Sequence, residues 1–104
     1  METEEFSQEL IKLGVRIRQL RKHRKLKLLD LEVLSGINDS DLSRYERGKE
    51  NIEFLTIYKL AKALEVEIAL ITDYDGDLPD NVKFKGLGKA NALSTRKRKS
   101  TRKN

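Results

Sequence analysis

The chain has 104 residues, a formal net charge of +5, and equal shares (38%) of hydrophobic and charged residues. This length suits one small domain plus tails. Cysteine is absent and His23 is the only histidine, which excludes disulfides and thiolate chemistry and makes a histidine-built metal site or triad improbable. The longest unbroken apolar run, Ile68 to Ile71, is too short to span a membrane. We therefore expect a soluble cytoplasmic protein that is not an enzyme and has no metal or cofactor.

The charge is distributed unevenly along the chain. Residues 81–104 carry nine basic side chains and no acidic one, and the stretch between Leu10 and Leu29 carries eight basic side chains and no carboxylate. Between them, from Glu50 to Asp80, eight acidic residues stand against two lysines. Two basic zones that flank an acidic one suit a protein with one face toward a polyanion, although an ordinary solvated surface would give the same pattern.

Apolar periodicity predicts four helices in the first 64 residues. The first helix follows from steps of three and four residues, with the arginines and lysines off this stripe and facing water or a ligand. The later helices are expected over Leu28–Leu34, from about Asp39 to Glu46, and over Glu53–Leu64. The first stripe consists of Phe6, Leu10, Leu13, Ile17 and Leu20, and the fourth helix has the stripe Phe54, Ile57, Leu60, Ala61 and Leu64.

The second and third predicted helices have the order of a helix-turn-helix. Gly36 stands where a helix commonly ends in a left-handed residue, and Asn38 can cap the next helix, with Asp41 at the spacing of a capping box. The third helix has only Leu42 and Tyr45 as apolar residues, so its exposed face must have another use. A short helix, a glycine turn and a polar helix together fit a unit that enters the DNA major groove, with free N–H groups at the helix start near phosphate.

After Leu64 the period changes. Alternating Val66, Ile68 and Leu70 predict a short strand over 66–72, with one helical turn as the competing interpretation. From Gly86 onward Gly, Ser, Thr, Lys and Arg prevail, which predicts disorder. We therefore divide the chain into a helix-turn-helix domain at 1–80, with its core at about 6–72, and a flexible basic tail at 81–104.

The strings LGVRIRQLR (residues 13–21) and LSRYERGK (residues 42–49), with Gly36 between them, closely resemble the Cro/C1-type (XRE) helix-turn-helix family. The resemblance covers roughly residues 10–71. It implies a mainly α, lambda-repressor-like bundle of four to five helices and a homodimer. It also implies sequence-specific binding to double-stranded DNA at a near-palindromic operator, usually in repression. The chain departs from the family pattern at Leu28, where glutamine is common, at Glu32, where a small alanine allows close helix crossing, and at Ile52, where proline is common.

The resemblance also assigns functional positions. Arg44 has the chemistry to bind guanine O6 and N7 with two hydrogen bonds, whereas Asp39 either accepts from cytosine N4 or only caps its helix. Arg21 and Glu46 would form a structural ion pair that fixes the pose of the third helix. Base-reading positions are Asp39, Ser40, Ser43 and Arg44; phosphate-contacting positions are Lys27, Asn38, Arg47, Lys49 and Asn51; and Val66, Ile68 and Leu70 would form the dimer interface by pairing of the predicted strand with its symmetry mate.

Our leading hypothesis is therefore a homodimeric transcriptional regulator, most readily a repressor, associated with the nucleoid. The first alternative is an antitoxin that autoregulates its operon and uses residues 83–104 to bind a toxin or another protein partner. The second is a nonspecific nucleic-acid-binding or coactivator protein, in which the basic tail supplies most of the affinity and a steep salt dependence. We expect no membrane partner.

Overall fold

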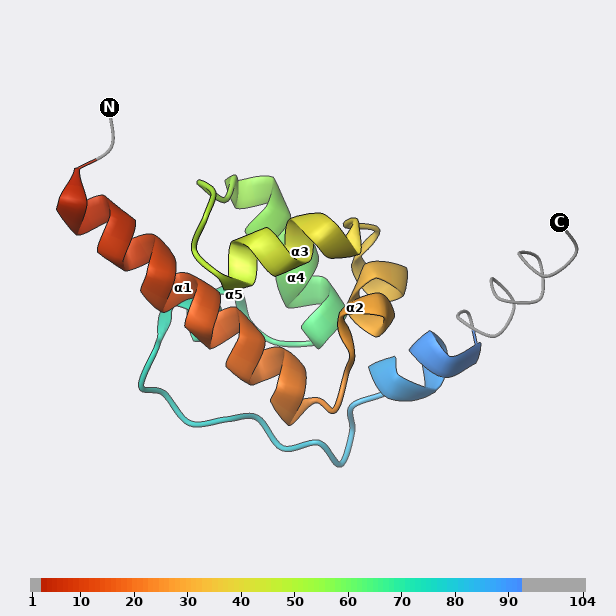
Figure 1. The fold of residues 1–104 in the computed structure, drawn as a ribbon. Coiled ribbons are helices and arrows are strands. Elements are labelled where there is room, and N and C mark those ends of the chain that lie inside the picture. Colours follow the sequence, from red (N-terminus) through yellow and green to blue (C-terminus); the bar gives the residue numbers. More distant parts are fainter. Residues whose placement is uncertain (1–2, 93–104) are drawn as a thin grey trace, which may run out of the picture.

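The computed structural model describes residues 3–92, which form a bundle of α-helices with no strand among them (Figure 1). The mainly α fold and the four predicted helices are confirmed. No helix in this part of the chain has the length and apolar character needed to cross a lipid bilayer. The elements are α1 (Glu4–His23), α2 (Leu28–Ser35), α3 (Asp39–Glu46), α4 (Phe54–Leu64) and α5 (Ile68–Thr72), and residues 86–92 are helical again.

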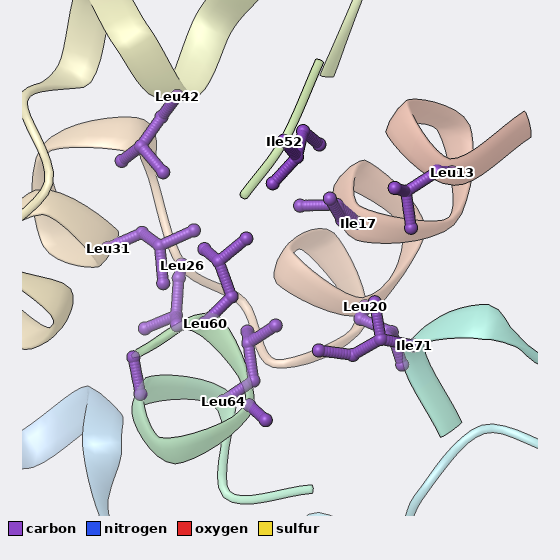
Figure 2. Close-up of a cluster of buried hydrophobic side chains, with 12 residues drawn as sticks. Leu13, Ile17, Leu20, Leu26, Leu31, Leu42, Ile52, Leu60, Leu64 and Ile71 are labelled. Atoms are coloured by element: carbon purple, nitrogen blue, oxygen red, sulfur yellow. The ribbon is translucent and has the colours of Figure 1, made fainter. Parts of the chain in front are cut away.

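One cluster of aliphatic side chains forms the core, and each of the elements α1 to α5 contributes to it (Figure 2). The inner faces of α1 and α4 supply most of these side chains, because their apolar residues recur at helical spacing. Two predicted stripe residues are exceptions, because the side chains of Phe6 and Phe54 are 37% and 67% exposed. The inner faces of α1 and α4 therefore each begin one turn later, at Leu10 and Ile57. The fully buried members with branched side chains are Ile17, Leu20, Leu31, Leu42, Leu60, Leu64 and Ile71.

The predicted strand over 66–72 is wrong and the competing interpretation of a helical turn is confirmed, because Ile68–Thr72 forms the short helix α5. Helical spacing turns Ile71 into the core, where it is fully buried, while Val66 and Leu70 are only partly buried against it. The Nε of Arg16 donates to the carbonyl oxygen of Leu70 at 3.0 Å and so satisfies an acceptor in α5. A stretch this short shows alternation and helical spacing equally well, so packing against α1 and α4 decides its structure.

Three arginines of α1 and its C-terminal cap are buried, contrary to the prediction that the basic side chains of the first helix face water or a ligand. Arg16, Arg21 and Arg24 are 1%, 7% and 4% exposed. The Nε and Nη2 of Arg24 donate to the carbonyl oxygens of Leu64 and Glu65, the terminal acceptors of α4. Burial lowers the pKa of Arg24, and the nearby charges of Glu65 and Asp80 oppose that shift. These guanidinium groups therefore connect α1 and its cap to other helices through hydrogen bonds.

The chain continues to pack on the bundle beyond residue 80, where we placed the start of the tail. Residues 73–85 run along α1 to the helical segment 86–92 (Figure 1). The Nδ2 of Asn81 donates to the carbonyl oxygen of His23, and the guanidinium carbon of Arg24 lies 4.3 Å from the ring centroid of Phe84. Ala90 is fully buried. The folded domain thus extends at least to Ala90, and the basic run of residues 96–99 lies outside the described residues.

The crossing of α1 and α3 depends on the absence of a side chain at Gly14. A Cβ atom there would lie 2.4 Å from the carbonyl oxygen of Tyr45 and 2.6 Å from that of Glu46. Both obstacles are backbone atoms, which cannot rotate away as a side chain would. The backbones of the two helices can therefore approach this closely only if residue 14 is glycine.

We predict that Gly14→Ala lowers the free energy of unfolding by about 1–3 kcal/mol or more, because the helices must separate to admit the methyl group. Gly88→Ala is the matched control, since a Cβ there meets nothing within 4 Å and lies in a helical segment. The control should be neutral or slightly stabilising. Denaturant unfolding of both variants measures the difference, and equal stabilities would contradict the close crossing.

Candidate nucleic-acid interface

The turn between α2 and α3 has the geometry of a helix-turn-helix. Gly36 ends α2 in the left-handed conformation, with φ of +76°, and its N–H donates to the carbonyl oxygen of Glu32. Leu31 of α2 and Leu42 of α3 are fully buried and hold the two helices on the same core. The opposite side of α3 consequently faces outward (Figure 1).

Side chains of the protein satisfy the first N–H groups of α3. The Oδ1 of Asn38 accepts from the N–H of Ser40 at 2.8 Å and also from the Ser40 hydroxyl. The Oε1 of Glu32 accepts from the N–H of Asp39 at 2.7 Å. We expected these two N–H groups to be free for phosphate. They are instead bound by side chains of the protein. The predicted capping box with Asp41 is not among the described contacts at the start of α3, and the Oδ1 of Asp41 pairs with Arg44 instead.

Glu32 helps to cap the start of α3, a role that the sequence interpretation missed. We saw it only as a departure from the small alanine common at that position, yet its carboxylate reaches the positive end of α3. A carboxylate seven residues before a predicted helix start was the available signal. The side chain points to α3, and so it does not obstruct the packing of the two helices.

A buried ion pair fixes α3 against α1. The Nε and Nη2 of Arg21 donate to the two carboxylate oxygens of Glu46, at 2.7 and 3.0 Å. The remaining Nη1 donates to the carbonyl oxygen of Leu26 in the loop before α2, at 2.8 Å. Arg21 therefore joins α1, the entry to α2 and the end of α3 through one guanidinium group. This is the pairing of residues that the family resemblance implies.

The four predicted base-reading residues lie on one side of α3. Asp39 and Ser40 are exposed in its first turn, and Ser43 and Arg44 are half-buried one turn later. Positions separated by four residues are neighbours on a helix surface, so the four side chains form one patch. Leu42 and Glu46 occupy the buried side. The fold thus brings the four residues together on the outward-facing side of α3.

The five predicted phosphate-contacting residues flank this patch at both ends of the unit. Lys27 lies at the start of α2 and Asn38 at the start of α3, and the others follow the end of α3. All five are exposed. The side chain of Asn38 is engaged as a helix cap, and Arg47 Nε donates to the carbonyl oxygen of Ser43 at 3.3 Å. The residues after α3 are Arg47, Lys49 and Asn51.

Arg44 has two carboxylate partners that the sequence interpretation did not include. Its Nε donates to the Oε1 of Glu50 at 2.6 Å, and its Nη2 pairs with the Oδ1 of Asp41. Asp41 precedes Arg44 by three residues on the same helix, and this spacing was the signal available in the sequence. Glu50 lies in the loop after α3, and no sequence pattern predicts that it folds back.

The predicted dimer residues are occupied within their own chain. Val66, Ile68 and Leu70 are partly buried against the core, and α5 leaves no strand edge to pair with a symmetry mate. A different apolar surface is open on α4. Phe54, Leu55 and Tyr58 are all more than 40% exposed and are neighbours at helical spacing.

Comparisons with known proteins agree with this geometry. Residues 17–71 match the family model described as Helix-turn-helix. The chain is 36% identical over 64 residues to an uncharacterized HTH-type transcriptional regulator, y4dJ, of Sinorhizobium fredii, over 61% of this chain and 83% of that protein. Its fold is similar to the crystal structure of the restriction-modification controller protein C.AhdI from Aeromonas hydrophila. That match has a TM-score of 0.60 and 38% sequence identity and covers 62% of this chain and 97% of that one.

We predict that Glu46→Ala lowers the free energy of unfolding by about 3–5 kcal/mol, because it leaves the Arg21 charge buried without a counter-charge. Lys12→Ala is the control, since it removes a pair, Lys12–Glu9, in which both side chains are more than half exposed. That control should change stability by no more than about 0.5 kcal/mol. Thermal unfolding provides the comparison, and an unchanged melting temperature for Glu46→Ala would refute the structural role of the pair.

Proposed function

Because the chain belongs to the Cro/C1-type (XRE) helix-turn-helix family of DNA-binding transcriptional regulators, we propose that it reads a near-palindromic operator as a homodimer and represses transcription there. The observation that carries this proposal is the patch of Asp39, Ser40, Ser43 and Arg44 on the outer side of α3. The buried pair beneath it, Arg21–Glu46, holds the patch in a fixed orientation.

The chemistry of the patch suits direct readout. Arg44 can donate two hydrogen bonds to a guanine, and the serine hydroxyls can donate or accept at several bases. Lys27 before α2 and Lys49 after α3 would contact phosphates on either side and set the register of α3 in the groove. The helix would then enter the major groove with its N-terminal half, as in other helix-turn-helix proteins.

A homodimer would place two copies of α3 about 34 Å apart, one turn of the duplex, and so require two related half-sites. The apolar surface of Phe54, Leu55 and Tyr58 on α4 is our candidate for part of the contact, because a second copy that covers these exposed side chains removes their apolar surface from water. The proposal moves the interface from the predicted strand to α4. Such a regulator would act at the nucleoid.

Control of a restriction-modification system is the more specific candidate. It is favoured by the 38% identity with C.AhdI, a restriction-modification controller, over nearly the whole length of that chain. The genomic positions of the sites that this protein selects would distinguish this role from regulation of other genes.

We predict that selection from fragmented genomic DNA at physiological salt yields a near-palindrome with half-site centres about ten base pairs apart. Arg44→Ala should then weaken binding to the best site by about 1–3 kcal/mol and relax the base preference at one position in each half-site. Lys59→Ala is the control, because it removes one exposed positive charge from α4 and not from the predicted base-reading or phosphate-contacting residues. Binding that is uniform over sequence and indifferent to Arg44 would overturn the proposal.

We further propose that the basic run at the C-terminal end, outside the described residues, adds affinity for the DNA backbone. Residues 93–104 contain six basic side chains and no acidic one. A truncation after residue 92 retains the buried Ala90 and removes all six.

We predict that this truncation weakens binding equally at the operator and at unrelated duplexes. It should also flatten the slope of log K against log salt by about 0.9 for each phosphate that the shortened protein no longer neutralises. Titrations at several salt concentrations measure both quantities. Loss of discrimination between sites, with an unchanged slope, would indicate that the run reads a groove instead.

A further inference from the structure

The guanidinium group of Arg44 is held on one edge by the protein itself. Glu50 accepts from its Nε at 2.6 Å, and Asp41 pairs with its Nη2. These two nitrogens form the side edge of the planar group. The two carboxylates approach from different segments, one from α3 and one from the loop that follows it, so the plane of the guanidinium is fixed by two independent contacts.

The other edge of the same group stays open. Among the described contacts of Arg44, none engages Nη1, and the side chain is 39% exposed. Guanidinium has five N–H donors, and the end edge formed by Nη1 and the second hydrogen of Nη2 suffices for a bidentate contact with guanine. Arg44 can therefore engage a guanine without releasing either carboxylate.

We propose that Asp41 and Glu50 are specificity-determining residues that position Arg44 for guanine and discourage its use on phosphate. The inference rests on the proposed function and adds two residues to its reading surface. The carboxylates act through Arg44 and need not touch DNA. They are therefore positioning residues, and Arg44 remains the group that contacts the base.

Charge and geometry both favour this role. A phosphate is an anion that accepts a hydrogen bond from almost any direction. Two carboxylates beside Arg44 therefore strongly weaken the attraction between its guanidinium group and a phosphate, wherever on the DNA the protein lies. Guanine O6 and N7 carry no net charge and demand two donors in one plane, which the held guanidinium already provides. Asp41 and Glu50 thus lower the affinity for arbitrary DNA. They also reduce the conformational entropy that the Arg44 side chain loses when it binds the correct base.

The alternative arrangement has the opposite consequence. If Asp41 and Glu50 merely competed with DNA for Arg44, their removal would strengthen binding to the operator at least as much as to unrelated sequence. The ratio of the two dissociation constants therefore distinguishes positioning from competition, whereas the operator affinity alone does not.

The test uses Glu50→Gln and Asp41→Asn in the full chain, with dissociation constants for the best operator and for a scrambled duplex of the same length and salt. We expect each variant to bind the scrambled duplex more tightly and the operator no better, so that the specificity ratio falls by about three- to tenfold. Glu53→Gln is the matched control. It removes an exposed charge from the same loop, and none of its described side-chain contacts is an ion pair or a helix-cap hydrogen bond. It should leave the ratio unchanged.

A second arm repeats the measurement in the Arg44→Ala background. If the carboxylates act by positioning Arg44, Glu50→Gln should there shift both dissociation constants by the same factor, because only the general charge effect is left. A specificity loss that persists without Arg44 overturns the proposal, as does an unchanged or increased ratio in the single variants.

A readout without DNA separates this inference from the proposed function. The Nε–H proton of Arg44 should exchange slowly with water in the wild-type protein and quickly in Glu50→Gln, as followed by nuclear magnetic resonance. Equal exchange in both proteins overturns the positioning contact even if α3 reads DNA. Slow exchange with no operator preference in the wild type would instead overturn the proposed function and, with it, the assignment of specificity to these two residues.

Discussion

The buried pair between Arg21 and Glu46 is the contact on which the orientation of α3 depends. Two short hydrogen bonds join them, and a third ties Arg21 to the loop that leads into α2. A helix of eight residues with one fully buried leucine has too little apolar surface to fix its own pose. The ion pair fixes the orientation of α3, which hydrophobic burial cannot do, because carboxylate and guanidinium form two good hydrogen bonds in one plane only. Gly14 complements it by letting the backbones of α1 and α3 approach closely.

Basic residues in this protein have two different physical roles. Arg16, Arg21 and Arg24 are buried and bind carbonyl or carboxylate oxygens of other elements, so they contribute to cohesion rather than to an outward field. Lys27 before α2 and Lys49 after α3 stay exposed. The net charge of the chain therefore overstates the positive potential available to DNA. The position of the exposed basic side chains relative to α3 therefore matters more than their total number.

Acidic side chains lie next to α3 and bind its polar groups. Glu32 satisfies the N–H of Asp39, and Asp41 and Glu50 hold Arg44. A helix start that lacked such partners would attract any phosphate, because its free N–H groups and dipole favour anions without regard to sequence. Here these polar groups are already bound within the protein. If α3 reads DNA as proposed, contacts to base edges would therefore gain weight relative to contacts that only follow the phosphate backbone.

Local patterns in the sequence determined the helices α1 to α4, the left-handed turn at Gly36 and the cap at Asn38, because each depends on residues within a turn or two of one another. They also identified α3 as the outward-facing helix, since its apolar residues are too few for a buried one. Tertiary structure alone decided the rest. Only packing against α1 and α4 made Ile68–Thr72 a helix, and only long-range contacts buried Arg16, Arg21 and Arg24. The path of the loop after α3, which no local pattern specifies, brought Glu50 to Arg44. A charged side chain looks solvent-exposed in any periodic pattern, and its burial depends on an oxygen supplied by a segment far away in the chain.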